Sequence, residues 1–211
     1  MSPRVDEPLV EQRAVGDLSL LPTVTFGSRS LMWWGTLGFM VIEGWTLALI
    51  VAMYFYLRQN YDAWPPLHTP APGIAVATWN LAVMLVSCVP AFLAARAGKR
   101  LDRGAARIWV TVLALFGLAT VILRWYELWA LNVRWDTNAY GTAAWTIVGV
   151  HATLLLLDVA DTIGLSLFYW IGRSPVKMLS DTNDNSFYWY FTVGVWIPLY
   201  VIVYLGPRLF G

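Results

Sequence analysis

Hydrophobic positions along the chain gather into five long stretches that are almost free of charged residues. They cover residues 31–57, 73–95, 108–131, 142–171 and 186–206. Each is near or above the roughly 18 apolar residues that a helix needs to cross a bilayer core about 30 Å thick. Backbone polar groups find no water in lipid and must bond within the segment, as they do in a helix. The pattern therefore predicts an all-α polytopic membrane protein, a bundle of five transmembrane helices.

The breaks between the apolar stretches carry loop chemistry. Residues 64–73 contain four prolines, residues 96–107 contain five basic side chains, and residues 173–185 are polar with one proline. Proline lacks an amide hydrogen and interrupts helices, so the first break is expected to be a loop. We expect two parts in the chain, a cytoplasmic N-terminal tail at residues 1–30 and a five-helix transmembrane domain at residues 31–211.

Composition agrees with this fold class and sets the expected orientation. Hydrophobic residues make up 58% of the chain and charged residues 13%, against about 25% charged residues in soluble domains. The formal net charge of +1 gives no basic surface for nucleic acid. Ten basic residues lie in the tail and in the 96–107 and 173–185 segments, and three lie on the opposite side. Since cytoplasmic loops carry the excess of Lys and Arg, the N-terminus is predicted inside and the C-terminus outside.

Polar side chains inside the spans are the candidate functional residues, because burying them in lipid is costly. These candidates are Glu43, Asn80, Arg124, Glu127, His151, Asp158 and Asp161. Glu43 lies near the middle of the first span, and we expect it to be neutral and hydrogen-bonded unless a cation is close. A role in proton relay is the alternative for this carboxyl. Asn80, which shares a helix face with Ser87, is expected to bond between helices.

The remaining candidates are spaced so that they can meet on one helix. Arg124 and Glu127 are three residues apart, which allows a structural ion pair. His151 and Asp158 differ by about 20° around the helix axis, and Asp161 follows about 60° further on. We expect these three to form a polar stripe that faces protein rather than lipid. His151 is interpreted as a packed histidine, and the two aspartates could bond each other, a nearby backbone or a partner subunit.

Ligand sets for a redox centre are missing from the sequence. The only histidines are His68, in the proline-rich loop, and His151, and the only cysteine is Cys88. A copper or zinc centre made by the protein needs several His or Cys ligands. A phosphate-binding glycine loop and a Ser/His/Asp arrangement are not found either. The sequence thus predicts no catalytic, metal or cofactor site in this chain, which favours a protein that serves another subunit.

A series of short motifs runs from about Leu31 to Leu205. In order they are Glu43 in an aromatic-rich first span, Trp64-Pro65-Pro66, Asn80 with Ser87 and Cys88, Glu127 in RWYELW, Gly149-Val150-His151, and Tyr188-Trp189-Tyr190-Phe191 followed by Val195-Trp196. In this order and spacing the chain resembles subunit III of the haem–copper oxidases, in its short five-helix bacterial form. Glu43 falls on the family's buried carboxylate position.

The chain departs from the family pattern at several positions, which indicates a divergent member. Leu154 and Tyr190 stand where the family has histidines, and Val193 stands where it has an aspartate. Arg124 takes a position often held by Gln. Asp158 and Asp161 are additional carboxyls.

The resemblance implies a non-catalytic integral subunit of a terminal respiratory oxidase in the bacterial inner membrane. Such a subunit packs on catalytic subunit I, holds phospholipid in a cleft, and supports assembly, proton uptake and stability. The haems and copper are then expected in partner subunits, and the oxidase would use cytochrome c or quinol. An accessory subunit of nitric oxide reductase is the related alternative. A small transporter using Glu43, Arg124, His151 and Asp158, or an independent membrane enzyme, belongs to a different class.

Overall fold

The computed structural model describes residues 25–172 and 176–209, so most of the expected N-terminal tail lies outside the described residues. The elements are η2 (Gly27–Arg29), α1 (Leu31–Arg58), α2 (Ile74–Lys99), α3 (Arg103–Trp129), α4 (Ala139–Trp170), α5 (Lys177–Tyr200), the π-helical η3 (Val201–Leu205) and α6 (Gly206–Leu209). These ranges contain no β-strand. Five helices are long and apolar enough to cross a membrane, the fifth extending from Lys177 to Leu209. The predicted all-α fold with five such helices is confirmed.

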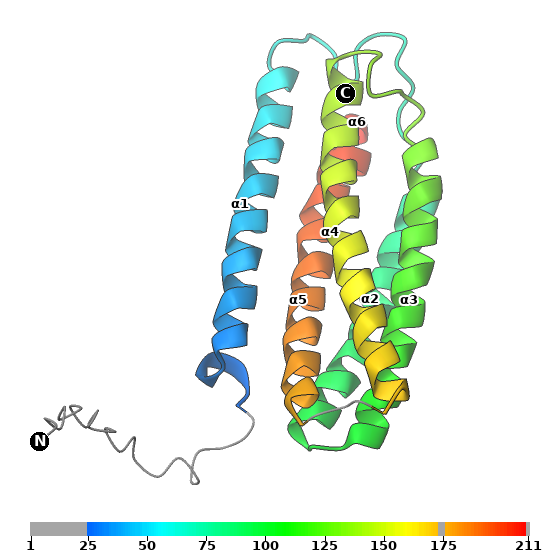
Figure 1. Cartoon of the computed structure of the whole chain (residues 1–211). Coiled ribbons are helices and arrows are strands. Elements are labelled where there is room, and N and C mark those ends of the chain that lie inside the picture. Colours follow the sequence, from blue (N-terminus) through cyan, green and yellow to red (C-terminus); the bar gives the residue numbers. More distant parts are fainter. Residues whose placement is uncertain (1–24, 173–175, 210–211) are drawn as a thin grey trace, which may run out of the picture.

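The five long helices are not equally buried. Figure 1 shows α2, α3, α4 and α5 gathered in one bundle, with α1 standing beside α4 and α5. In the most apolar 18-residue stretch of α4, 50% is buried inside the chain. In the corresponding stretch of α1, only 6% is buried. Apolar side chains such as Phe39, Ile42 and Trp45 therefore point away from the bundle. This arrangement leaves α1 to lie against lipid or another subunit along most of its length.

The predicted start of the last span was wrong. The 173–185 segment was expected to be a break, but α5 begins at Lys177 and includes its polar residues. Several of these are buried, among them Thr182, Asn183 and Asp184. Thr182 and Tyr169 of α4 share a hydrogen bond of 2.8 Å between their hydroxyl oxygens. These polar side chains face neighbouring helices rather than lipid, so they do not interrupt the helix.

The basic break at 96–107 is also shorter than predicted. Helix α2 continues to Lys99 and α3 starts at Arg103, which leaves a turn of residues 100–102 between them. Asp102 caps α3, because its Oδ1 accepts a hydrogen bond of 3.0 Å from the Ala105 amide. A side-chain acceptor at this position satisfies an amide at the start of a helix. The end of α2 and the start of α3 thus contain basic residues that lie outside the apolar stretches 73–95 and 108–131.

The proline-rich segment 64–73 contains no long helix, as predicted, and closes one end of the bundle. Trp64 is buried there, with its ring edge-on to Tyr54 and Tyr140. The Gly73 amide donates to Ala130 O at 2.6 Å, and Arg208 Nη2 donates to Pro72 O at 2.6 Å. These contacts tie the segment to the end of α3 and to α6.

An exposed ion pair lies on the loop between α3 and α4. Arg134 Nε and Nη2 donate to Asp136 Oδ1 and Oδ2 at 3.0 and 2.9 Å. These hydrogen bonds from Arg134 hold the pKa of the Asp136 carboxyl below its ordinary value. The pair is open to solvent, so it is expected to add little to stability.

Candidate functional site

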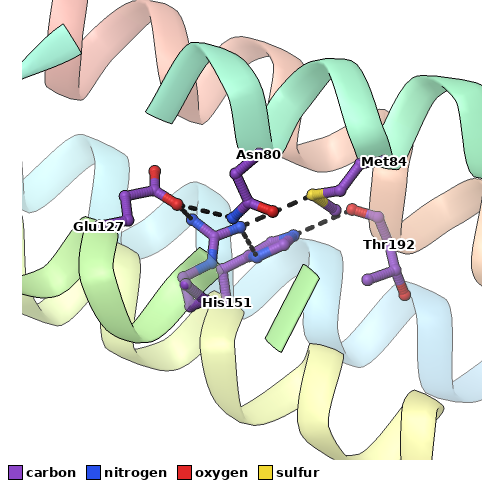
Figure 2. Close-up of polar contacts among 6 residues, drawn as sticks. Asn80, Met84, Glu127, His151 and Thr192 are labelled. Carbon is purple, nitrogen blue, oxygen red and sulfur yellow. Dashed lines mark hydrogen bonds and ion pairs between the residues drawn. The ribbon is translucent and has the colours of Figure 1, made fainter. Parts of the chain in front are cut away.

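Arg124 and Glu127 form a buried ion pair on α3. Arg124 Nη1 lies 2.8 Å from Glu127 Oε2, and the two side chains are 3% and 0% exposed. Figure 2 shows Glu127 between neighbouring helices, with the side chains of Asn80 and His151 beside it. The predicted pairing of residues three apart on the helix is confirmed, and it occurs inside the protein rather than at its lipid surface.

Asn80 and His151 bring two further helices to this pair. Asn80 Nδ2 of α2 donates to Glu127 Oε2 at 2.8 Å, which confirms the expected bond between helices. Arg124 Nη2 lies 3.3 Å from Nδ1 of His151 on α4. We call these four residues, Asn80, Arg124, Glu127 and His151, the Arg124 cluster. The cluster joins α2, α3 and α4 through charged and polar groups that are all buried.

The contacts of His151 determine its tautomer. A guanidinium group only donates hydrogen bonds, so Nδ1 must accept from Arg124. The other ring nitrogen, Nε2, lies 2.9 Å from the carbonyl oxygen of Thr192 on α5, which only accepts. His151 fits both contacts as the neutral ring with its proton on Nε2. With both nitrogens occupied, His151 is a packed histidine and not a free ligand, as the sequence indicated.

The Arg124 guanidinium is covered on its remaining sides by α2 and α5. It lies over the Trp196 ring, 3.6 Å from the ring centroid, and its Nη2 lies 3.8 Å from Met84 Sδ. Stacking on an aromatic face stabilises a cation that water cannot reach. The charge is therefore held within the four-helix bundle and is out of contact with lipid.

A second polar group lies between α1, α4 and α5. Tyr188 Oη donates to Glu43 Oε2 at 2.6 Å, so Glu43 is hydrogen-bonded as expected. Thr192 Oγ1 donates to Asp158 Oδ2 at 3.0 Å, and Asn185 Nδ2 donates to Asp161 Oδ2 at 3.2 Å. The two aspartates thus bond to α5 and not to each other. Asp158 is buried but Asp161 is exposed, so the predicted protein-facing stripe does not bury all of its members.

These carboxyl groups border a cavity of about 720 Å³, which we call the acidic cavity. It is lined by the first half of α1, the second half of α4 and the first half of α5. The carboxylic side chains on its wall are Glu43, Asp158, Asp161, Asp181 and Asp184. Thr192 connects the cavity to the Arg124 cluster, since its hydroxyl bonds Asp158 and its carbonyl oxygen accepts from His151.

Comparison with known proteins finds relatives that share one name. No protein-family model matches the chain. Proteins named cytochrome c oxidase subunit 3 align with most of it. The Synechocystis protein is 24% identical over 85% of this chain and 77% of its own length. The Thermostichus vulcanus protein is 24% identical over 82% and 87%, and that of Corynebacterium diphtheriae is 25% identical over 81% and 85%. The chain is therefore similar to cytochrome c oxidase subunit 3 over more than four-fifths of its length, at low identity.

The seven candidate residues predicted from the sequence fall into two places. Asn80, Arg124, Glu127 and His151 meet in the Arg124 cluster, and the other three border the acidic cavity. Within residues 25–172 and 176–209, no group of three or more His, Cys, Asp or Glu side chains is placed to hold a metal ion.

Sequence reasoning missed the part of α5 that completes both places. Asp181, Asp184, Asn185 and Tyr188 line the acidic cavity, and Thr192 links it to the Arg124 cluster. The polar residues at 181, 185, 188 and 192 recur every three or four positions, which is the spacing of one helix face. This spacing is visible in the sequence, but it lies partly in the segment that was expected to be a break.

Proposed function

We propose that this chain is the non-catalytic subunit III of a haem–copper terminal respiratory oxidase in a bacterial inner membrane. The observation that carries the proposal is the alignment with proteins named cytochrome c oxidase subunit 3 over more than four-fifths of the chain. The haems and copper reside in catalytic partners, with cytochrome c or quinol as electron donor. The role of this chain is to support the assembly, proton uptake and stability of catalytic subunit I.

The packing of the bundle supports a scaffold role. The charged groups of the Arg124 cluster contact one another and their neighbours across α2, α3, α4 and α5. Helix α1 presents an apolar surface that the other described helices leave uncovered. The acidic cavity, at about 720 Å³, is within the range of roughly 300–1,000 Å³ typical of ligand pockets. We assign this cavity to bound lipid.

The orientation of the bundle follows from its basic residues. The start of α1, the turn between α2 and α3, and the start of α5 gather at one end of the molecule (Figure 1). Arg96, Lys99, Arg100, Arg103 and Arg107 belong to this end. By the positive-inside rule this end faces the cytoplasm, and the opposite end with α6 faces outward. The acidic cavity then lies in the cytoplasmic half of the membrane.

Co-purification tests the proposed function. An affinity-tagged chain isolated in mild detergent is expected to bring down a large integral subunit that carries haem and copper. The absorption spectrum and metal content of the isolated material identify that partner. A nitric oxide reductase core with non-haem iron would replace the oxidase proposal by its related alternative. Haem bound by the chain alone, or substrate flux through the chain in liposomes without any partner, would contradict a non-catalytic accessory role.

Replacement of Glu43 by alanine is expected to leave the haem spectrum of the purified complex unchanged. Glu43 Oε2 accepts a hydrogen bond of 2.6 Å from Tyr188, which connects α1 to α5. Loss of a hydrogen bond to a carboxyl group costs about 1–3 kcal/mol. The attachment of α1 should weaken, so activity should decay severalfold faster during continuous turnover. Initial rate, spectrum and half-life of activity are measured on the same preparation.

Tyr188→Phe is the matched control for this experiment. It removes the donor of the same hydrogen bond but keeps the Glu43 carboxyl. An equally shortened half-life in both variants indicates that the α1–α5 contact is the cause. A complex that loses haem when Glu43 is replaced would contradict this interpretation of the residue.

A further inference from the structure

A second cavity lies at the other end of the bundle, beside α6. Its volume is about 180 Å³, and we call it the outer cavity. The end of α1, the proline-rich segment and the residues from η3 to α6 form its wall, which includes Tyr54, Arg58, Trp64 and Gly206. A water molecule takes up about 30 Å³ in the liquid. The outer cavity is therefore large enough for several water molecules.

Buried hydroxyl groups lead from the outer cavity to the Arg124 cluster. The rings of Tyr54 and Tyr140 both lie edge-on to Trp64, at centroid distances of 5.4 and 5.3 Å. The Tyr140 hydroxyl interacts electrostatically with those of Tyr54 and Tyr204. Tyr204 interacts in the same way with the Glu127 carboxyl. We call Tyr54, Tyr140, Tyr204 and Glu127 the outer polar column, because each member is within range of the next.

The column lies close to the helix ends at this side of the bundle. Glu127 is two residues before the end of α3, and Tyr140 is the second residue of α4. Since a helix rises about 1.5 Å per residue, both are within one turn of those ends. The proline-rich segment covers them, and Asn138 Nδ2 donates to its Thr69 Oγ1 at 2.8 Å. The column is thus buried, but only a short distance below the surface.

Four polar atoms along this route have no hydrogen-bond partner among the described residues. They are Trp64 Nε1, Tyr140 Oη, Tyr204 Oη and Glu127 Oε1. None of these four residues is more than 3% exposed. An unpaired polar group is costly to bury, and a carboxylate oxygen especially so. The set includes an N–H donor, two hydroxyls that can donate or accept, and an oxygen that only accepts.

We propose that the outer polar column is a water-binding site, filled from the outer cavity and closed at its inner end by Arg124. Water both donates and accepts, and a buried water typically makes about three hydrogen bonds to otherwise unpaired groups. A water beside Tyr204 and Glu127 donates to Glu127 Oε1 and accepts from Tyr204 Oη. A free ion does not match the site, because the charges of Arg124 and Glu127 already balance.

The column has one open end. The Arg124 guanidinium is covered by the Trp196 ring and Met84, and both ring nitrogens of His151 beyond it are occupied. A fixed guanidinium group also excludes protons from a polar path. Water therefore reaches the Glu127 carboxylate without creating a proton path across the membrane. The site does not depend on which partner the chain joins, so it stands or falls apart from the proposed oxidase role.

Radiolytic labelling of the full chain in lipid nanodiscs tests the proposal. X-ray pulses convert water into hydroxyl radicals, which oxidise the nearest side chains before they can diffuse away. A fully buried tyrosine is therefore oxidised where water is bound beside it. Mass spectrometry measures the oxidation rate of each residue. We expect Tyr140 and Tyr204 to be oxidised severalfold faster than Tyr169.

Tyr169 is a matched control for Tyr140. Tyr140 is the second residue of α4 and Tyr169 the second to last, and their side chains are 0% and 4% exposed. The Tyr169 hydroxyl differs because it already has a protein partner, Thr182 Oγ1 at 2.8 Å. If Tyr140 and Tyr204 were oxidised no faster than Tyr169, the proposal would be overturned.

A cavity-filling variant tests the entrance of the column. Gly206 lines the outer cavity, and a Cβ atom there would lie 3.7 Å from Val201 O and 4.0 Å from Tyr54 Oη, which are ordinary contacts. Gly206→Leu should fill the entrance and slow the oxidation of Tyr140 and Tyr204 severalfold. An unchanged rate at Tyr140 and Tyr204 would overturn the outer cavity as the source of the water.

Gly194→Leu is the matched control for the cavity-filling variant. Gly194 belongs to the same membrane span, a Cβ atom there would meet nothing within 4 Å, and the residue does not line the outer cavity. It should leave the oxidation of Tyr140 and Tyr204 as in the unmodified chain. The rate at Tyr169 reports in each variant that the bundle is intact.

Removal of one hydroxyl tests the column without filling any space. Tyr140→Phe keeps the ring but deletes a partner of the bound water, so the oxidation of Tyr204 should slow severalfold. Tyr169→Phe removes a hydroxyl at the other end of α4 and should leave Tyr204 unaffected. Equal oxidation of Tyr204 in both variants would overturn the assignment of Tyr140 to the water site.

Discussion

Replacing Arg124 with methionine is expected to lower the free energy of unfolding by about 3–5 kcal/mol, the usual cost of removing one partner of a buried ion pair. Glu127 is fully buried and would keep the amide hydrogen bond from Asn80 but lose the cation that pairs with its charge. The guanidinium contacts to His151 and the Trp196 ring would be lost as well. Methionine fills most of the volume, so the effect reports the missing charge rather than a cavity. Equilibrium unfolding in mixed detergent micelles, followed by tryptophan fluorescence, measures it.

Neutralising both members of the pair provides the control. Arg124→Gln/Glu127→Gln removes both charges but keeps polar groups that can bond each other and Asn80. A double-mutant cycle with the single variants Arg124→Gln and Glu127→Gln isolates the interaction between the two residues. We expect the double variant to have a clearly higher free energy of unfolding than either of these single variants. If Arg124→Met lowered the free energy of unfolding by less than about 1 kcal/mol, the ion pair would behave like one exposed to solvent. That result would contradict its burial in the bundle.

The five helices could be predicted because lipid imposes a strong constraint on sequence. Helix α1 spans Leu31–Arg58, against a predicted stretch of 31–57, and α4 spans Ala139–Trp170, against 142–171. In lipid, apolar length alone determines such segments. The same criterion failed where a helix continues past its apolar part. Helix α3 begins at Arg103 under an Asp102 cap, five residues before its predicted start.

The start of α5 could not be found from hydropathy for a different reason. Asn183 and Asn185 are polar, yet both are buried within the chain. A search for apolar residues treats this face as a break. The recurrence of polar side chains every three or four residues is the signal that would have extended the helix.

The sequence identified the partner of a polar side chain when both residues lie on one helix, but not when they lie on different helices. Arg124 and Glu127 were paired correctly because their contact depends only on the pitch of one helix. The partners of Glu43 and Asp158 are Tyr188 and Thr192, both on α5. Such contacts depend on how α1, α4 and α5 are rotated about their axes, which the sequence of one chain does not specify.

Replacing Trp189 with alanine is expected to lower the free energy of unfolding by about 3–5 kcal/mol, the cost of deleting a large buried aromatic side chain. Trp189 is fully buried in α5, and its Nε1 donates to Ser87 Oγ of α2 at 2.8 Å. Its ring also packs on α3, since a Cβ atom placed on Gly117 would lie 3.3 Å from Trp189 Cη2. One side chain therefore fills the space between three helices. The unfolding assay described for Arg124 measures the change in the free energy of unfolding.

Two further variants separate packing from hydrogen bonding at this position. Trp189→Phe keeps most of the apolar contact but removes the indole N–H, and Ser87 still donates to Met84 O. We expect it to cost about 1–2 kcal/mol, clearly less than alanine. Tyr190→Ala, at the next residue, removes a side chain that is 36% exposed and should change stability by less than about 1 kcal/mol. Residues 189 and 190 are neighbours in one helix turn. If Trp189→Ala and Tyr190→Ala lowered the free energy of unfolding equally, the Trp189 side chain would not lie in the interior of the bundle.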